Sequence, residues 1–148
     1  MKKSIDIVKL FQDAALQREW RFVYGARGFA EFETQSLQLA PNEEVLIMFP
    51  ASVQPVIESG YWSRYRVNTQ FWLMRKMEDD TESSIKETES EKYSARLRDL
   101  SFQIDDLLQK TLACHPSVQV ISIRYFRELN VFSSSLDGPT SDVTFEIW

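Results

Sequence analysis

The feature that most constrains the fold is a stripe of apolar side chains in the second half of the chain. Its members repeat at alternating spacings of four and three residues: Tyr93, Leu97, Leu100, Ile104, Leu107 and Thr111. This spacing is typical of one face of an amphipathic helix. The opposite face is polar and carries Arg96, Asp99, Asp106 and Lys110. Thr88 and Glu91 have capping-box spacing, so the helix is predicted to begin there and to end before Pro116.

Four other segments have the patterns of strands. Residues 45–49 are apolar on both faces and are followed by a proline, as expected for a short strand buried on both sides. Apolar and polar residues alternate over 65–76, which predicts a long half-buried strand. It should run antiparallel to the first, since the link is too short for a helical crossover. Residues 118–126 and 143–147 are interpreted as a closing hairpin with a long loop at 130–141.

The N-terminal third is predicted to hold one helix and little other regular structure. Ser4 can cap this helix, which is expected to fade near residues 19–24. Its apolar residues at helical spacing are Ile7, Leu10, Phe11 and Ala14. Residues 29–38 are interpreted as a short extended segment, and 51–60 as a connection between strands.

Together these elements predict a single α+β domain over residues 1–148. It has an N-terminal helix, a mixed and mostly antiparallel sheet of four to five strands, one long amphipathic helix packed across that sheet, and a C-terminal β-hairpin. A chain of this length can bury a substantial core but not two large ones.

Charge and cysteine content narrow the possible function classes. The net charge of −5 disfavours a non-specific nucleic-acid binder, which needs a concentrated basic surface. The single cysteine excludes an internal disulfide. No apolar run approaches the roughly 20 residues of a membrane helix, and the chain does not begin like a signal peptide. We therefore expect a protein made in the cytoplasm, with neither a membrane nor sequence-specific nucleic acid among its partners.

Residues 78–91, EDDTESSIKETESE, form the most acidic stretch of the chain. This composition favours a solvated loop that leads into the long helix. The alternative interpretation is a flexible acidic arm that orders on contact with a neighbouring subunit. Asp79 and Asp80 are then its candidate contact residues.

No motif predicts catalysis or metal binding. His115 follows Cys114, but adjacent residues rarely direct their side chains at each other, and a third orienting group would be needed. The pair is interpreted as a helix end with a buried thiol and a histidine that suits the helix dipole. Asp137 and Gly138 are interpreted as turn residues rather than as part of a cation site. We expect no enzyme activity, no cofactor and no metal.

Aromatic and basic residues gather in one segment, which contains Tyr61, Trp62, Arg64, Tyr65, Arg66 and Trp72. Rings interleaved with arginines can stack on nucleic-acid bases or anchor protein–protein contacts. The acidic net charge favours the protein interface. The candidate interface residues are Tyr61, Trp62, Arg64, Arg66, Asp79, Asp80, Asp137 and Trp148.

Several stretches in order carry a family resemblance: WRFVYG at 20–25, the strand at 46–50, the long helix, ELNVF at 128–132, LDG at 136–138, and the terminal strand. This pattern resembles the small neck and tail-completion proteins of tailed bacteriophages, the tail terminator and head–tail joining group, including versions in phages and prophages of Bacteroidetes. The resemblance implies a subunit that forms a ring, commonly a hexamer, at the head-proximal end of the tail and joins the tail to the head. It implies as partners further copies of the chain, the tail tube protein and head-completion or neck proteins, all within the virion. It carries over no catalytic residue.

In such a ring, the acidic segment 78–91 is expected to face the arginines of 61–66 across the interface between copies. The loop at 133–141 is expected to project toward a neighbour or the tail tube, so that its deletion would leave the monomer folded but impair docking. Two alternatives stay open. The chain could be a cytoplasmic adaptor that binds proteins without forming a ring, or another neck-ring component such as a head-completion or stopper protein.

Overall fold

The computed structural model describes residues 6–40, 42–76, 97–131 and 136–148. Along the chain these form α1 (Ile7–Gln17), β1 (Arg21–Tyr24), α2 (Arg27–Ser36), β2 (Glu44–Met48), β3 (Ser52–Glu58), β4 (Tyr61–Lys76), α5 (Arg98–Leu108), the π-helical segment η2 (Gln109–Ala113), β5 (Val118–Val131) and β6 (Leu136–Ile147).

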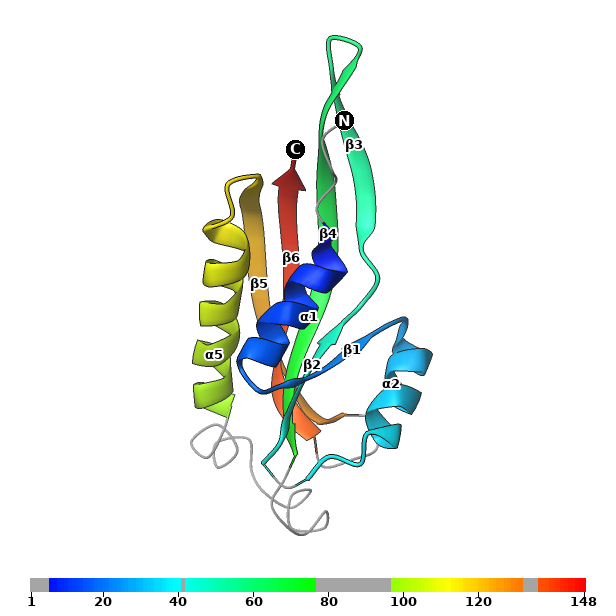
Figure 1. Cartoon of the computed structure of the whole chain (residues 1–148), viewed down its shortest axis with the longest axis vertical. Helices are drawn as coiled ribbons and strands as arrows, with labels where there is room; N and C mark the ends of the chain where they lie inside the picture. Colours follow the sequence, from blue (N-terminus) through cyan, green and yellow to red (C-terminus); the bar gives the residue numbers. More distant parts are fainter. Residues whose placement is uncertain (1–5, 41, 77–96, 132–135) are drawn as a thin grey trace.

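The strands form one six-stranded sheet in the order β1-β2-β4-β6-β5. Two strands share the edge of β4 that faces away from β6. β3 pairs with the first part of β4, and β2 pairs with its last part. β1 and β2 are parallel, whereas the other described pairings are antiparallel. The predicted α+β fold is confirmed, with an N-terminal helix, a mixed sheet, a helix across it and a C-terminal hairpin (Figure 1). The sheet has more strands than the predicted four to five.

The larger core lies between one face of the sheet and the helices α1, α5 and η2. Four residues of the predicted helical stripe are fully buried, as expected for a face that packs on the sheet: Leu97, Leu100, Ile104 and Leu107. Phe11 of α1 meets Phe71 of β4 with ring centroids 4.2 Å apart. The predicted start of this helix at residues 88–91 lies outside the described residues, as does the acidic segment 78–91.

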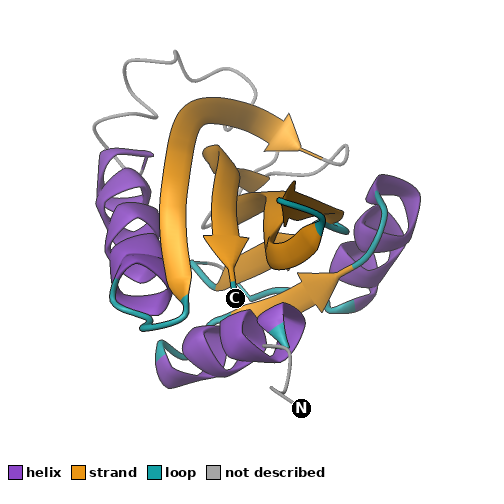
Figure 2. Ribbon diagram, turned by 90° about the horizontal axis from the view of Figure 1, so that it is seen from above, coloured by secondary structure: helices purple, strands orange, loops and turns teal. Residues whose placement is uncertain are grey.

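A smaller core lies on the opposite face of the sheet, where Ala30 of α2 packs with Val45, Ile47, Trp72 and Met74. Residues of β2 alternate between the two cores, so this strand is buried on both faces, as predicted. Figure 2 shows that β5 bends strongly and arches over the face opposite α1. Two register shifts between β5 and β6 mark bulges, which bend and twist a strand.

Three predictions for the N-terminal half were wrong. Residues 29–38 lie mostly in α2 rather than in an extended segment, because Ala30 and Thr34 are buried at helical spacing. Residues 51–60 contain the strand β3 rather than only a connection. The N-cap of α1 is Asp6, whose side chain accepts a hydrogen bond from the Lys9 N–H at 3.0 Å.

The predicted loop at 130–141 is also largely a strand. β5 continues to Val131 and β6 already begins at Leu136. The segment 136–141 is buried between β4 and β5, so it does not project toward a neighbour. Gly138 permits this packing, since an added Cβ would overlap the carbonyl oxygen of Leu73 in β4. Deleting 133–141 would therefore remove part of the core.

Candidate assembly interface on the β3–β4 hairpin

β3 and the first part of β4 form a hairpin that extends beyond the helices at one end of the molecule (Figure 1). Its two turn residues, Ser59 and Gly60, both have positive φ, at 50° and 81°. Such values are typical of the tight two-residue turn that joins twisted antiparallel strands. β6 pairs with β4 only from Tyr65 onward, so the tip is held by the hairpin's own pairing.

The register of the hairpin separates its side chains by polarity, because directly opposed residues share a face. One face is apolar and carries three opposed pairs: Val53 with Val67, Pro55 with Tyr65, and Ile57 with Trp62. Val67 belongs to the core beneath α1, so this face continues the helix-covered side of the sheet. A bulge beside Ile57 keeps Trp62 in phase with Tyr65 rather than with Arg64.

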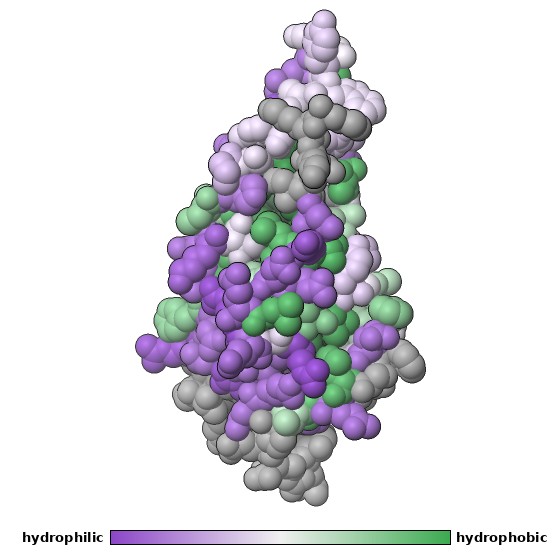
Figure 3. All heavy atoms as spheres, in the orientation of Figure 1, coloured by the Kyte–Doolittle hydropathy of each residue, from purple (hydrophilic) through white to green (hydrophobic). Residues whose placement is uncertain are grey.

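The apolar face is largely uncovered toward the tip. Trp62 is 66% exposed, Ile57 58%, Val53 56% and Tyr65 39%, and Tyr61 at the tip is 77% exposed. In the space-filling view, the narrow hairpin end stands above a broader body whose visible face mixes polar and apolar side chains (Figure 3). Within the described residues, the β3–β4 hairpin carries the main group of large apolar side chains that are exposed together.

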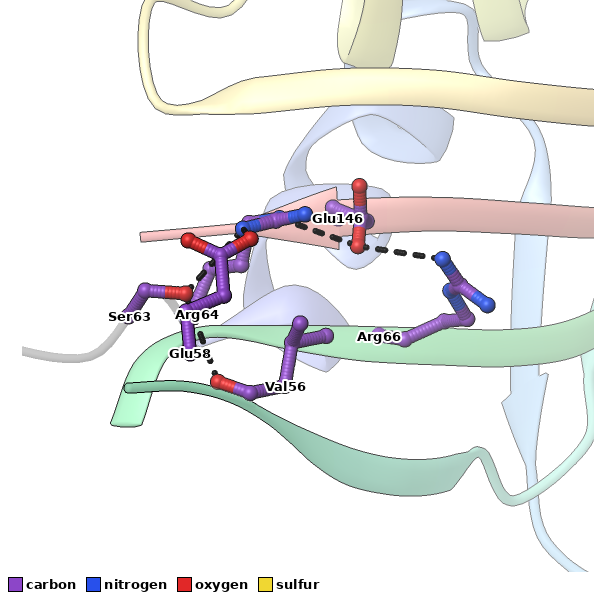
Figure 4. Close-up of polar contacts among 6 residues, drawn as sticks. All are labelled: Val56, Glu58, Ser63, Arg64, Arg66 and Glu146. Atoms are coloured by element: carbon purple, nitrogen blue, oxygen red, sulfur yellow. Dashed lines mark hydrogen bonds and ion pairs between the residues drawn. The ribbon is translucent and has the colours of Figure 1, made fainter. Parts of the chain in front are cut away.

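The opposite face of the hairpin is polar and is tied to β6 through Glu146 (Figure 4). The Glu146 side chain is only 5% exposed, and its Oε2 lies 3.1 Å from Arg64 Nε and 3.4 Å from Arg66 Nη2. Arg64 Nη1 also donates to Glu58 Oε1 at 2.7 Å, across the hairpin. The hydrogen bond to Glu58 and, as the next largest cause, the one to Glu146 raise the pKa of the Arg64 guanidinium. The bond from Arg64 lowers the pKa of the Glu58 carboxyl. The cluster therefore links the polar face of the hairpin to β6.

Five of the eight predicted interface residues fall into three groups. Tyr61 and Trp62 are exposed together at the tip. Arg64 and Arg66 lie on the polar face and pair with carboxylates of their own chain. Asp137 was wrongly predicted as an interface residue, since it is fully buried within β6.

Two predicted residues are outside the described part of the chain, and one lies beside the hairpin. Asp79 and Asp80 are not among the described residues, so their pairing with the arginines stays a prediction. Trp148 is 47% exposed and follows Ile147, which pairs with Tyr65. Sequence reasoning missed Val53 and Ile57, although the Ser-Gly dipeptide after SVQPVIE is a hairpin signal.

An open hollow of about 450 Å³ lies between α1 and the end of η2 with the residues that follow it. Its lining includes Leu10 and Ala14 of α1, with Cys114, His115 and Pro116 opposite them. Cys114 is exposed, so the prediction of a buried thiol was wrong. His115 Nδ1 accepts a hydrogen bond from the Ser117 N–H at 3.2 Å, which orients the ring.

Asp106 of α5 pairs with two cations that line the hollow, Arg18 and Lys110. Its Oδ2 lies 2.8 Å from Arg18 Nη2 and 3.1 Å from Lys110 Nζ. The Arg18 and Lys110 hydrogen bonds lower the pKa of the Asp106 carboxyl. Both cations that line the hollow are therefore paired with a carboxylate of the same chain.

Among the described residues, no three His, Cys, Asp or Glu side chains are grouped as metal ligands. No helix in this part of the chain has the length and apolar character needed to span a membrane. The sequence matches no protein-family model, and a search of curated proteins gives no match.

Proposed function

We propose that this chain is a structural subunit that acts by docking on further copies of itself, as a tail terminator-like ring subunit of a tailed phage. In this role it sits at the head-proximal end of the tail and joins the tail to the head or neck. Its partners are neighbouring copies, the tail tube protein and head-completion or neck proteins. The phage role rests on the family resemblance, whereas the docking role rests on the geometry of the hairpin.

The observation that carries the docking role is the uncovered apolar face of a projecting hairpin. A two-stranded hairpin is marginally stable in water by itself, and apolar side chains at its tip gain nothing from the core. Exposed apolar patches on soluble proteins mark interaction sites. The Glu146 cluster supports the same interpretation, because its side chains pair with one another on the polar face and leave the apolar face uncovered.

The position of the hairpin suits a ring. It lies at one end of the molecule, where it can dock head to tail on a different patch of a neighbour. Such a heterologous contact closes into a ring when the rotation between copies is right.

The test is the mass and shape of the purified protein in solution. We expect native mass spectrometry to give a multiple of 17.3 kDa, with six copies as the favoured number, and electron microscopy to give annular particles. A monomer at the highest soluble concentration, with no annular particles and no binding to tail tubes, would contradict the proposal. A monomer that binds another protein would favour the adaptor alternative.

A further inference from the structure

We infer that Glu146 is a positioning residue for docking. Its buried carboxylate, bonded to two arginines of β4, sets the direction in which the hairpin presents its apolar face to a neighbouring copy. This inference rests on the proposed self-assembly, and it assigns part of the specificity to a residue outside the apolar contact surface. Glu146 lies near the end of β6, whereas the hairpin that it orients projects beyond the helices (Figure 1).

The hairpin leaves the sheet between Arg64 and Tyr65. β6 pairs with β4 from Tyr65 onward, and the partner of Tyr65, Ile147, is the last residue of β6. In the described sheet, residues 57–64 therefore pair only within the hairpin, between β3 and β4. A two-stranded ribbon twists more strongly than a larger sheet and is only marginally stable by itself. The direction of the tip thus depends on side-chain contacts made close to this point.

The two arginines bonded to Glu146 lie on either side of that point (Figure 4). Arg66 is directly opposite Glu146 in the β4–β6 register, and its Nη2 lies 3.4 Å from Glu146 Oε2. Arg64 lies two residues nearer the tip on the same face, and its Nε lies 3.1 Å from the same oxygen. The shorter contact therefore reaches from the part of β4 that lacks β6 back to the sheet. Among the described residues, no other ion pair or side-chain hydrogen bond joins residues 57–64 to β6.

The burial of the Glu146 carboxylate favours a positioning role over a purely stabilising one. Removing a carboxylate from water is costly, and a buried ion pair often gives no more stability than apolar residues of the same size. Such a pair does favour one geometry, because moving the partners apart leaves a buried charge without compensation. The bond from Arg64 to Glu58 lacks this property, since the Glu58 side chain is 59% exposed. Arg64–Glu146 is therefore the contact that best opposes a change in the direction of the hairpin.

The length of the hairpin makes small changes in direction important. From Arg64 to Gly60 at the turn, the strand rises about 13 Å at about 3.3 Å per residue. A rotation of about 10° at Arg64 would move the turn by roughly 2 Å, enough to break side-chain contacts that form within about 4 Å. Loss of a fixed direction lowers the fraction of molecules that are ready to dock, and the apparent affinity falls with that fraction.

Spin-label distances measure the direction of the hairpin. Tyr61→Cys at the tip and the exposed native Cys114 provide two labelling sites in one chain. Labelled protein is mixed with an excess of unlabelled protein, so that only distances within a chain are recorded. We expect a narrow distance distribution with Glu146 intact and a broad or displaced one in Glu146→Gln. Glu58→Gln is the matched control and should leave the distribution narrow, because Glu58 belongs to the hairpin itself.

The association of the unlabelled variants tests whether this direction matters for docking. In sedimentation velocity over a range of concentrations, Glu146→Gln should associate about 3–10-fold more weakly than the parent, since fewer molecules present the hairpin correctly. Glu58→Gln should stay within about twofold of the parent.

Val143→Ala controls for a general loss of stability. It removes buried volume from the helix-covered face of β6, on the opposite side of the strand from Glu146. This variant should keep both the narrow distribution and the association of the parent.

Three results would overturn the inference: Glu146→Gln keeps the narrow distribution, or broadens it without weaker association, or behaves like Val143→Ala. In each case the proposed function stands as long as the parent assembles. A parent that remains monomeric would instead remove the proposed function together with the docking role of Glu146, whichever distances are measured.

Discussion

Replacing Gly138 with alanine should strongly destabilise the fold, because the added Cβ has no room. It would overlap the carbonyl oxygen of Leu73 and lie 2.9 Å from its carbonyl carbon and 3.1 Å from the Cα of Met74. All three are backbone atoms of β4, so no side-chain rotation relieves the overlap. The two strands would have to separate by about an ångström at the centre of the sheet. We expect a loss of at least about 3 kcal/mol in the free energy of unfolding.

Gly28→Ala is the matched control. Gly28 lies in the first turn of α2, and an added Cβ meets nothing within 4 Å. Alanine is favoured over glycine in helices by up to about 1 kcal/mol, so this variant should be as stable as the parent or slightly more stable.

Urea denaturation followed by tryptophan fluorescence measures both variants. With a denaturant slope of about 1–3 kcal/mol per molar, Gly138→Ala should lower the midpoint by at least about 1 M. A midpoint equal to that of the parent would refute the packing of residues 136–141 inside the sheet and restore the projecting loop predicted from the sequence.

Three further outcomes are expected. Glu146→Gln removes the buried carboxylate that two arginines share and should lower the free energy of unfolding by about 2 kcal/mol, measured by urea denaturation. The exposed control Glu58→Gln should change it much less. Equal effects of the two variants would argue against a special role for the buried carboxylate. The Asp106 carboxyl has a lowered pKa in the folded state because of its cationic neighbours, so its contribution is present above about pH 4 and is lost as pH falls through the lower folded value. Melting temperatures of Asp106→Asn should therefore fall less steeply than those of the parent between about pH 4 and 2, and parallel curves would count against this coupling. Phe71→Ala should lower the free energy of unfolding by about 3–5 kcal/mol, because Phe71 is fully buried. Phe102 is 65% exposed, so Phe102→Ala should change this energy by no more than about 0.5 kcal/mol. Similar losses for the two variants in urea denaturation would contradict the assigned core.

Elements could be predicted from the sequence where burial requires apolar residues in a regular local pattern. The stripe through Leu100 and Ile104 predicted a helix because each turn must present an apolar residue to the sheet. The apolar run at 45–49 predicted a strand buried on both faces, and β2 fills both cores. In both cases the local pattern of apolar residues was sufficient to predict the type of element and the faces that it buries.

Sequence reasoning failed where a distant contact decided the structure. Asp137, Gly138 and Pro139 have the composition of a turn, yet they form part of a central strand because only glycine allows β6 to pass so close to β4. The carboxylate that holds Arg66 is Glu146, 80 residues away in the chain, and no local pattern connects them. Composition correctly drew attention to Tyr61 and Trp62 as exposed rings.

The central claim is that the uncovered face of the β3–β4 hairpin holds copies of this chain together. Its most direct test is the mass of the particle in solution for the parent, for Trp62→Ala, and for Gln54→Ala on the polar face of the same hairpin. We expect the parent and Gln54→Ala to form the same multimer, and Trp62→Ala to associate roughly 30-fold more weakly, as for a hot-spot residue. A Trp62→Ala protein that assembles to the parent's mass at the same concentrations would contradict the claim.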